Sequence, residues 1–394
     1  MSNTRDKFSS ELLSQSLDAL RNYIERENYR GYDPYDALNS PFFKLPFLRS
    51  NKLIRFGAQQ FVKRFPINLR PLLLIKKGLN PVSLGLCIQG YTTMGIKGLL
   101  SENDVRNYCQ PLIAELETMI PSGFHGACWG YDFDWEARYA CIPAYQPTIV
   151  ATGFITNALF KYYQFTNDTK SFSLCRSACD FILNDINRTQ GTDNSFCFSY
   201  SPFDKNQVFN ASMKGVRTLA QVYGVTKEAH LAEAAANAAR FVAGYQQPNG
   251  SWKYATQNKG EWIDNYHTGY VLDCFDEYRK HCGDSQYDQV IEKGFTFYRA
   301  HFFEDGCIPK FYDNAIYPID CTSAAQSILT LVRFNDTETA QNVAAFMVRK
   351  MQHRNGFFYF RAYKYFTEKH SFMRWSNSWM FAALPELLAP SKKQ

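Results

Sequence analysis

No stretch of this 394-residue sequence approaches 18 consecutive apolar residues, which excludes a membrane-spanning helix. The first residues, MSNTRDKFSSELL, carry no apolar leader, so we expect a cytoplasmic protein. The chain also lacks a glycine-rich phosphate loop, a G-x-S-x-G elbow and an H-E-x-x-H motif. Cys175 and Cys179 lie one helical turn apart without a nearby histidine, whereas a closed zinc site takes four ligands. We therefore expect no metal and no cofactor.

Acidic residues are missing from residues 43–78, which hold nine lysines or arginines. The net charge of the whole chain is only +6, so the remainder is net acidic and nucleic-acid binding is not expected. Phenylalanine, leucine, isoleucine and valine alternate with the bases in this segment. A basic amphipathic stretch of this kind packs against the main body, contacts an anionic membrane surface or binds an anionic polymer. The second alternative would place the protein peripherally at the inner membrane surface.

Aromatic residues are in excess, with 33 Phe, 25 Tyr and 6 Trp making up 16% of the chain. Such an excess either fills a very large core or lines a binding surface, because aromatic rings bury large apolar areas and stack on flat ligands.

From residue 81 onward the sequence repeats three parts: an apolar helix, an amphipathic helix with an N-cap residue, and a short aromatic loop. The amphipathic helices are predicted to begin near Ser101, Asp168, Thr226, Asp284 and Asp336. Those of the apolar, inner type are predicted to begin near Pro81, Pro147, Val208, Ile263, Ile319 and Arg374. Six such hairpins predict an all-α fold, an (α/α)6 toroid.

The first 40 residues contain one amphipathic helix without a preceding partner. We expect it to pair with the last inner helix and close the ring. The predicted organisation is thus a closing helix in 1–40, a basic amphipathic arm in 41–80 and the toroid in 81–394. A linear helical solenoid is the alternative, but a solenoid needs polar capping repeats, whereas the first and last helices here look complementary to each other.

In such a toroid, the starts of the inner helices surround the mouth of a funnel. Polar residues stand at all six starts, although the helices that follow are apolar: Asn80, Gln146, Asn210, Asp264, Asp320 and Arg374. These side chains either cap their helices or contribute to a site.

Three segments combine aromatic residues with charged or ionisable ones, residues 125–146, 262–270 and 372–379. Carboxylates between aromatic walls can act as acids or bases, and tryptophan and tyrosine faces stack on sugar rings. The predicted catalytic residues are Tyr131, Asp132, Asp134, Glu136, Arg138, Asp264, Tyr266, His267, Asp320 and Arg374. The predicted substrate-binding residues are Trp129, Trp135, Tyr145, Gln146, Tyr200, Asn210, Trp252, Tyr254, Trp262 and Trp375.

Two stretches, Gln246–Trp252 and Gln352–Phe358, resemble the repeats of squalene cyclases and prenyltransferases, in which Gln and aromatic residues brace helix ends. The acidic D-x-D-D motif of the cyclases is absent, since Trp135 follows Asp132-Phe-Asp134. Blocks at 65–73, 129–138, 264–273 and 374–380 are similar to a bacterial family encoded among capsule and surface-polysaccharide genes. That family is similar to the helical domain of D-glucuronyl C5-epimerases. The resemblance implies a glycan ligand that contains uronic acid.

The leading hypothesis is an enzyme of bacterial polysaccharide biosynthesis or modification that removes the C5 proton of a uronate, as an epimerase or a lyase. Arg138 or Arg374 would hold the carboxylate, and Tyr131, Tyr266 or His267 would relay protons. A second hypothesis is a glycoside hydrolase, with Asp132, Asp134 or Glu136 facing Asp264 or Asp320 across the bond. A third is a non-catalytic glycan-binding or scaffold protein of a polysaccharide assembly machine. Terpenoid cyclisation is a fourth.

Overall fold

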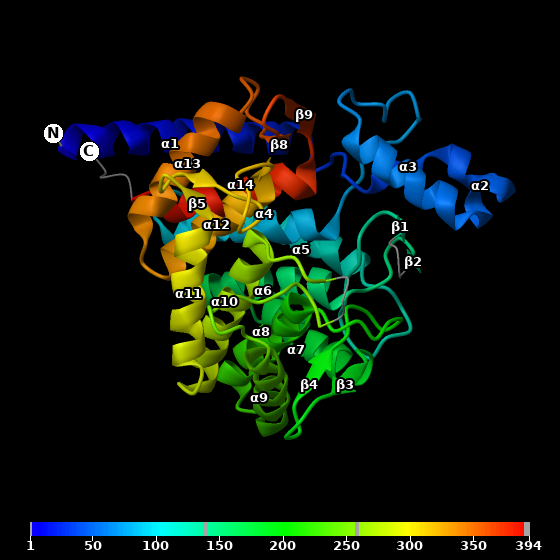
Figure 1. The fold of residues 1–394 in the computed structure, drawn as a ribbon, viewed down its shortest axis with the longest axis vertical. Coiled ribbons are helices and arrows are strands. Elements are labelled where there is room, and N and C mark those ends of the chain that lie inside the picture. The colour runs from blue at the N-terminus through cyan, green and yellow to red at the C-terminus, as the bar shows by residue number, and fades with distance from the viewer. Residues whose placement is uncertain (1, 137–140, 257–259, 390–394) are drawn as a thin grey trace.

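The computed structural model describes residues 2–136, 141–256 and 260–389 of the chain. Two concentric sets of helices dominate it (Figure 1). The inner helices are α4 (Pro81–Ile96), α6 (Ile149–Thr166), α8 (Phe209–Thr226), α10 (Asn265–Cys282), α12 (Cys321–Arg333) and α14 (Ser378–Ala383). The outer helices are α5 (Glu102–Thr118), α7 (Thr169–Asn184), α9 (Ala229–Gly244), α11 (Asp288–His301), α13 (Thr337–Met351) and α1 (Ser2–Arg26).

The inner helices form a closed ring, because each contacts the next and α14 contacts α4. Helix α1 packs against α13 and α14, and Figure 1 shows it beside α13 at one edge of the molecule. The predicted (α/α)6 toroid is therefore confirmed. The last inner element is irregular: a π-helical turn, η3 (Met373–Asn377), precedes α14, and a 3-10 turn, η4 (Leu384–Leu387), follows it.

Helix boundaries follow the capping residues of the sequence at most positions. The Ser101, Asp168, Asp264, Asp320 and Asp336 side chains each accept a hydrogen bond from a backbone N–H of the first helical turn. Two outer helices begin later than predicted. Thr226 ends α8, and α9 begins at Ala229. Asp284 likewise lies before α11, which begins at Asp288.

The strands are short antiparallel pairs in the loops that lead from outer to inner helices. They are β1 (Trp135–Glu136) with β2 (Cys141–Ile142), β3 (Arg188–Gln190) with β4 (Phe196–Phe198), β5 (Phe303–Glu304) with β6 (Ile308–Pro309), and a three-stranded sheet of β7 (Ile319–Asp320), β8 (Tyr359–Ala362) and β9 (Thr367–Ser371).

Two glutamines brace neighbouring outer helices. The Gln246 amide donates to the carbonyl of Val290 in α11, and the Gln352 amide donates to the carbonyl of Ser16 in α1. Gly356, in the loop that begins at Gln352, has a positive φ of 99°. It lies so close to the backbone of α1 that a Cβ would be 2.0 Å from the Ala19 carbonyl oxygen. These contacts tie α1 into the outer layer.

Residues 41–80 form the basic arm, which contains η2 (Pro41–Lys44), α2 (Pro46–Ser50) and α3 (Lys52–Arg64) and follows the short turn η1 (Asp36–Asn39). Figure 1 shows α2 and α3 standing out beside the toroid. None of the helices in the described ranges is long and apolar enough to cross a lipid bilayer.

Buried polar groups hold the arm. Arg55 of α3 donates to the carboxylates of Glu136 (3.0 Å) and Asp134 (3.3 Å), and Gln59 donates to the Asp134 carbonyl and accepts from the Glu136 backbone N–H. Further along, Arg70 donates to the Asp36 carboxylate at 2.7 Å. Arg55, Gln59, Arg70, Asp36 and Glu136 are all buried.

We expect Arg55→Ala to destabilise the packing of α3 against the β1 segment by about 3–5 kcal/mol, because the buried Glu136 carboxylate loses its partner. Limited trypsin digestion should then cleave within residues 44–64 much faster than in the wild type. The double variant Arg55→Leu/Glu136→Leu should restore most of the protection, since it leaves no unpaired buried charge. Equal protection of Arg55→Ala and wild type would contradict this role of the ion pair.

Lys214 of α8 lies inside the ring of inner helices and is 1% exposed. Its ammonium nitrogen is 4.1 Å from the ring centroid of Phe154 and 3.9 Å from that of Tyr270. Burial and the nearby Arg217 lower the pKa of Lys214 to about 7. Folding therefore disfavours the charged form of this lysine.

We expect Lys214→Met to raise the free energy of unfolding at pH 7 by about 1–3 kcal/mol. In the wild type, the unfolded chain keeps this proton up to pH 10.5 and the folded chain only up to about 7. Wild-type stability therefore rises between these pH values, and the advantage of Lys214→Met should shrink over the same interval. Urea denaturation of both proteins at pH 7 and pH 9.5 measures the difference between their free energies of unfolding. A variant less stable than wild type at pH 7 would show that the two aromatic contacts outweigh desolvation.

Candidate active site

The outer-to-inner loops enclose an aromatic funnel of about 390 Å³. Aromatic rings form most of its wall, and charged or ionisable side chains stand between them. The rings belong to Tyr35, Tyr131, Phe133, Trp135, Tyr200, Tyr254, Trp262, Tyr266, Phe311, Tyr312 and Trp375, and the charged or ionisable side chains to Lys63, Arg64, Asp264, His267, Arg361 and Arg374. A cavity of this volume with a polar and aromatic wall fits a sugar unit or a short glycan.

One wall holds an oriented histidine. His267 lies in the first turn of α10, where its Nδ1 is 2.6 Å from Asp264 Oδ2. Asp264 also caps this turn through the His267 backbone N–H and accepts from the indole N–H of Trp262. The Asp264 side chain is buried, whereas 19% of that of His267 is exposed. With Nδ1 donating to Asp264, the Nε2 atom is free to accept a proton, and no described residue hydrogen-bonds to it.

Aromatic rings surround this pair. Tyr254 and Trp262 are stacked at 4.5 Å between centroids, and Tyr254 lies 4.6 Å from the imidazole of His267. Tyr266 lies 4.1 Å from the same imidazole. The stacked pair presents an apolar face beside a proton-accepting nitrogen, which is the arrangement that sugar-ring recognition uses.

A second ionisable group, Tyr35, lies in the loop between α1 and η1. Its hydroxyl is 2.7 Å from the Lys63 ammonium of α3. Burial alone would raise the pKa of Tyr35, but Lys63, Arg361 and Arg374 outweigh burial, so this pKa is lowered from its ordinary value of 10. The Trp375 ring centroid lies 6.0 Å from that of Tyr35 and 6.0 Å from that of Tyr266, the residue whose ring contacts the His267 imidazole.

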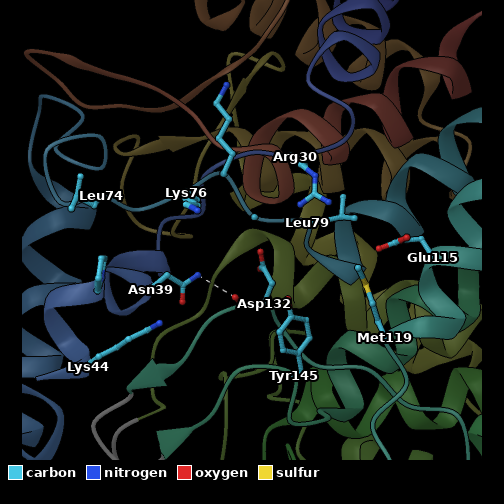
Figure 2. A pocket seen from close by; sticks show the side chains of 13 residues that line it. Arg30, Asn39, Lys44, Leu74, Lys76, Leu79, Glu115, Met119, Asp132 and Tyr145 are labelled. Carbon is cyan, nitrogen blue, oxygen red and sulfur yellow. Dashed lines mark hydrogen bonds between the residues drawn. The ribbon is translucent and has the colours of Figure 1, made fainter. Parts of the chain in front are cut away.

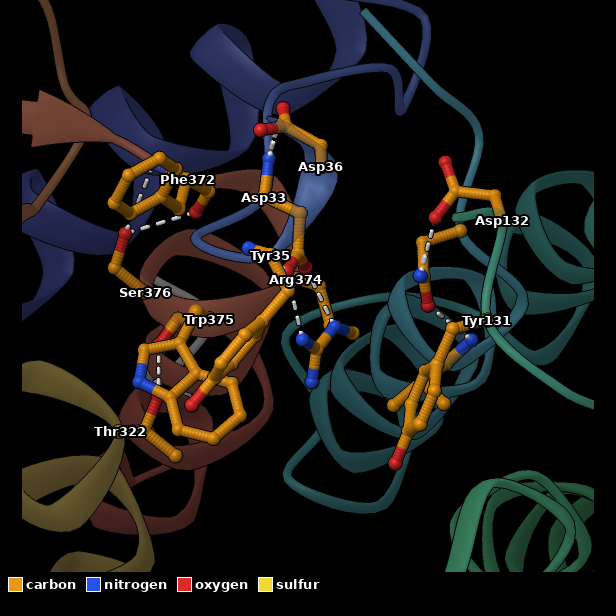
Figure 3. Close-up of polar contacts among 12 residues, drawn as sticks. Asp33, Tyr35, Asp36, Tyr131, Asp132, Thr322, Phe372, Arg374, Trp375 and Ser376 are labelled. Atoms are coloured by element: carbon orange, nitrogen blue, oxygen red, sulfur yellow. Dashed lines mark hydrogen bonds and ion pairs between the residues drawn. The ribbon is translucent and has the colours of Figure 1, made fainter. Parts of the chain in front are cut away.

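Two arginines of the funnel are anchored by buried carboxylates. Arg374 donates to both oxygens of Asp33 (2.7 and 2.9 Å), and its guanidinium lies 4.8 Å from the Tyr131 ring and 4.7 Å from the Trp375 ring. Arg361 of β8 donates to Asp320 at 2.6 Å. Each carboxylate fixes one edge of a guanidinium, so both cations are held in the wall of the funnel. Figure 3 shows the pair of Arg374 and Asp33.

Alternate side chains of residues 131–136 point to opposite sides. Tyr131, Phe133 and Trp135 line the funnel. Figure 3 shows Tyr131 and Asp132 pointing apart, and Asp132 lines a different cavity, where it accepts from the Asn80 amide. Burial and the neighbouring Asp33 raise the pKa of Asp132 to about 6.

The remaining acids of this segment also turn away from the funnel. Asp134 and Glu136 form the ion pairs with Arg55 that hold the basic arm. The expectation that Asp132, Asp134 and Glu136 face the ligand is therefore corrected by their placement, because the extended chain alternates its side chains and the aromatic ones take the inner side.

Four predicted ligand contacts also lie elsewhere. The indole N–H of Trp129 donates to the Leu116 carbonyl and that of Trp252 to the Val242 carbonyl, and both rings are buried in the core. Tyr145 lines the same cavity as Asp132, and Gln146 does not line the funnel.

Two predicted residues occupy other positions around the site. Asn210 is buried beside a small void that it shares with Asp264 and His267. The Asp320 carboxylate is fully buried, and it accepts from Arg361 and from the indole N–H of Trp375 at 3.4 Å. Arg138 lies outside the described residues.

The funnel brings together ten of the predicted residues with several that were not predicted. The ten are Tyr131, Trp135, Tyr200, Tyr254, Trp262, Asp264, Tyr266, His267, Arg374 and Trp375. The additional residues are Tyr35, Lys63, Arg64, Phe133, Phe311, Tyr312 and Arg361. Tyr35 and Arg361 lie in two aromatic-rich segments, RGYDPY (30–35) and NGFFYFRAY (355–363), and this composition is the signal that points to them. Lys63 and Arg64 lie on the basic arm, and no pattern in the sequence connects this arm with the funnel.

Comparison with known proteins identifies the fold. No protein-family model and no curated protein sequence matches the chain. Solved structures match at low sequence identity. A sugar epimerase from a ruminal bacterium is 12% identical, with a TM-score of 0.61 over 79% of this chain and 89% of that one. A family 76 glycoside hydrolase from a bovine Bacteroides thetaiotaomicron strain is 10% identical, with a TM-score of 0.56 over 78% and 69% of the two chains.

An unsaturated glucuronyl hydrolase mutant from Streptococcus agalactiae is 11% identical, with a TM-score of 0.56 over 99% of this chain and 92% of that one. The chain has the fold of these helical toroids. At this level of identity the likeness concerns the fold, and the function has to be argued from the funnel itself.

Proposed function

We propose that the protein is a carbohydrate-active enzyme of bacterial polysaccharide metabolism that removes the C5 proton of a uronate unit in a glycan. The observation that carries this proposal is the presence of two proton-transfer groups in one aromatic funnel. They are His267, which Asp264 orients, and Tyr35, whose pKa three cations lower. The similar structures, which include a sugar epimerase and a glucuronyl hydrolase, support sugar chemistry on this fold.

The proposed step begins with the uronate carboxylate beside Lys63, Arg361 and Arg374. His267 Nε2 takes the C5 proton, and the electron pair of the C–H bond moves into the carboxylate, whose enediolate form the cations stabilise. Tyr35 then donates its hydroxyl proton. Delivery to C5 on the opposite face gives the epimer. Delivery to the oxygen that leaves C4 breaks the glycosidic bond and gives a C4=C5 double bond.

The hydrolase hypothesis receives no comparable support. Two-carboxylate hydrolysis needs one carboxylic acid and one carboxylate that both face the bond. Asp264 is the one carboxylate among the described residues that line the funnel, and it is hydrogen-bonded to His267 and Trp262. Asp320 is bonded to Arg361. Asp132, Asp134 and Glu136 point elsewhere, as described above.

Incubation with uronate-containing polysaccharides in deuterated water tests the proposal. We expect deuterium at C5 of the uronate units, or an ultraviolet-absorbing unsaturated product if elimination follows. His230→Gln is a matched control, because His230 lies on the outer surface in α9, and it should react like the wild type. If the protein binds a panel of uronate polymers but gives neither exchange nor unsaturated product, the enzyme hypothesis is wrong and the glycan-binding scaffold is favoured.

A further inference from the structure

Helix α3 of the basic arm is amphipathic, but it buries polar side chains and exposes apolar ones. Its buried face consists of Arg55, Gln59 and Val62, and the helix contacts η1 and β1. Its opposite face exposes Leu53 (82%) and Phe61 (56%). A helix that buries an arginine and leaves leucine and phenylalanine in water loses the usual benefit of folding, unless an apolar phase covers the exposed side.

The exposed apolar side chains continue along the whole arm. Besides Leu53 and Phe61, they are Phe42, Leu45, Phe47, Ile67, Leu72 and Leu74. Exposed bases accompany them, namely Lys44, Arg49, Lys52, Arg64, Lys76 and Lys77, and residues 43–78 contain no acid. Interleaved bulky apolar and cationic side chains match the boundary between the acyl chains and the headgroups of an anionic bilayer.

A basic cavity of about 540 Å³ lies where the arm meets the toroid (Figure 2). Its cations are Arg30, Lys44, Lys76 and Lys77, and the exposed Leu74 forms part of its rim. Lys77 pairs with Glu27, whereas no ion pair joins Lys44 or Lys76 to a described residue. The cavity also contains Asp132 and Glu115, which leave its cations in the majority. An anionic headgroup is the ligand that such a mixed, open and cationic hollow favours.

The same arm forms part of the funnel. Lys63 and Arg64, at the end of α3, line the funnel wall, while Leu53 and Phe61 on that helix are exposed. A surface that receives this arm would therefore lie next to the funnel.

We propose that the basic arm docks the protein on an anionic bilayer, with its exposed apolar side chains among the lipids and headgroup phosphates in the basic cavity. The substrate would then be a glycan carried on a lipid anchor, an extension that rests on the proposed function. Docking itself does not depend on that function.

Flotation of the full-length protein with phosphatidylcholine vesicles, with and without phosphatidylglycerol, tests docking in the absence of glycan. We expect binding to the anionic vesicles and its loss at high salt. Leu53→Ser/Phe61→Ser should weaken binding at least tenfold. Lys44→Gln/Lys76→Gln should weaken it about 25-fold, since each charge contributes about fivefold. Phe203→Ser/Lys205→Gln, an exposed pair that lies outside residues 41–80, is the matched control and should bind within about twofold of wild type.

Equal binding of all variants, or no preference for anionic vesicles, would overturn docking. A dimer that forms in solution and requires Leu53 and Phe61 would also overturn it, because a second copy would then cover this face. Proton exchange on a soluble uronate glycan, measured without vesicles, reports separately on the proposed function. If both hold, Leu53→Ser/Phe61→Ser should lower kcat/KM on a vesicle-borne glycan and leave that on the soluble glycan unchanged. An equal effect on both glycans would refute the lipid-anchored substrate.

Discussion

The variant His267→Gln is expected to lower kcat for C5 proton exchange about 10³-fold, because a positioned general base contributes about 10²- to 10⁴-fold. Glutamine preserves a polar side chain of similar length but cannot take up the proton. The α10 turn should persist, since Asp264 caps it through the backbone N–H of residue 267. Single-turnover proton exchange in deuterated water measures the loss.

Asp264→Asn tests how His267 is oriented. The asparagine oxygen can still accept the capping bond, but it no longer favours the tautomer with a proton on Nδ1. We expect a loss of about 10²- to 10³-fold in kcat, with little change in KM and in the midpoint of thermal unfolding. A purely structural Asp264 would instead lower thermal stability and leave kcat per folded molecule unchanged. Activity of His267→Gln within threefold of the His230→Gln control would remove His267 from the reaction.

Tyr35→Phe is the second substitution with a large expected effect, a loss of about 10²- to 10³-fold in kcat. The ring and its contacts with Phe133, Trp135 and Trp375 are retained, so only the hydroxyl is removed. A proton donor must be protonated, and wild-type activity should therefore fall as pH rises through the pKa of Tyr35, which lies below its ordinary value of 10. The residual activity of Tyr35→Phe should lack this alkaline decline.

Lys63→Met separates the charge from the hydroxyl. Removal of the ammonium group next to Tyr35 raises the pKa of the phenol, so the alkaline decline of activity should move to higher pH. Tyr365→Phe, at an exposed position of the β8–β9 hairpin, is the matched control and should keep the wild-type profile. An unchanged pH profile in both Tyr35→Phe and Lys63→Met would show that the tyrosine is only part of the wall.

The architecture was accessible from the sequence because each hairpin repeats the same physical signals. Apolar segments rich in small residues must lie inside, segments with one polar face must lie outside, and Ser or Asp marks where several of the helices begin. The late starts of α9 and α11 show the limit of these signals. Thr226 is suited to capping, yet its hydroxyl instead donates to the Val222 carbonyl within the last turn of α8.

Only part of the candidate site could be predicted from the sequence. His267 and Asp264 were predicted together because they share the first turn of a helix, where spacing in sequence determines spacing in space. The acids at 132, 134 and 136 were expected to face the same cavity, but an extended chain places alternate side chains on opposite sides. Which side faces the ligand depends on what packs behind the segment, and here Arg55 of the basic arm takes Asp134 and Glu136.

The sequence by itself therefore determined the ring of six hairpins, the aromatic loops at one end and the polar starts of the inner helices, because these follow from local periodicity and capping. Only the tertiary structure decided which charged groups meet in the funnel. Tyr35, Lys63, Arg361 and Arg374 come from four separate segments, and closure of the ring brings these segments together. Contacts between residues so distant in sequence arise from packing, which leaves no periodic trace in any one segment.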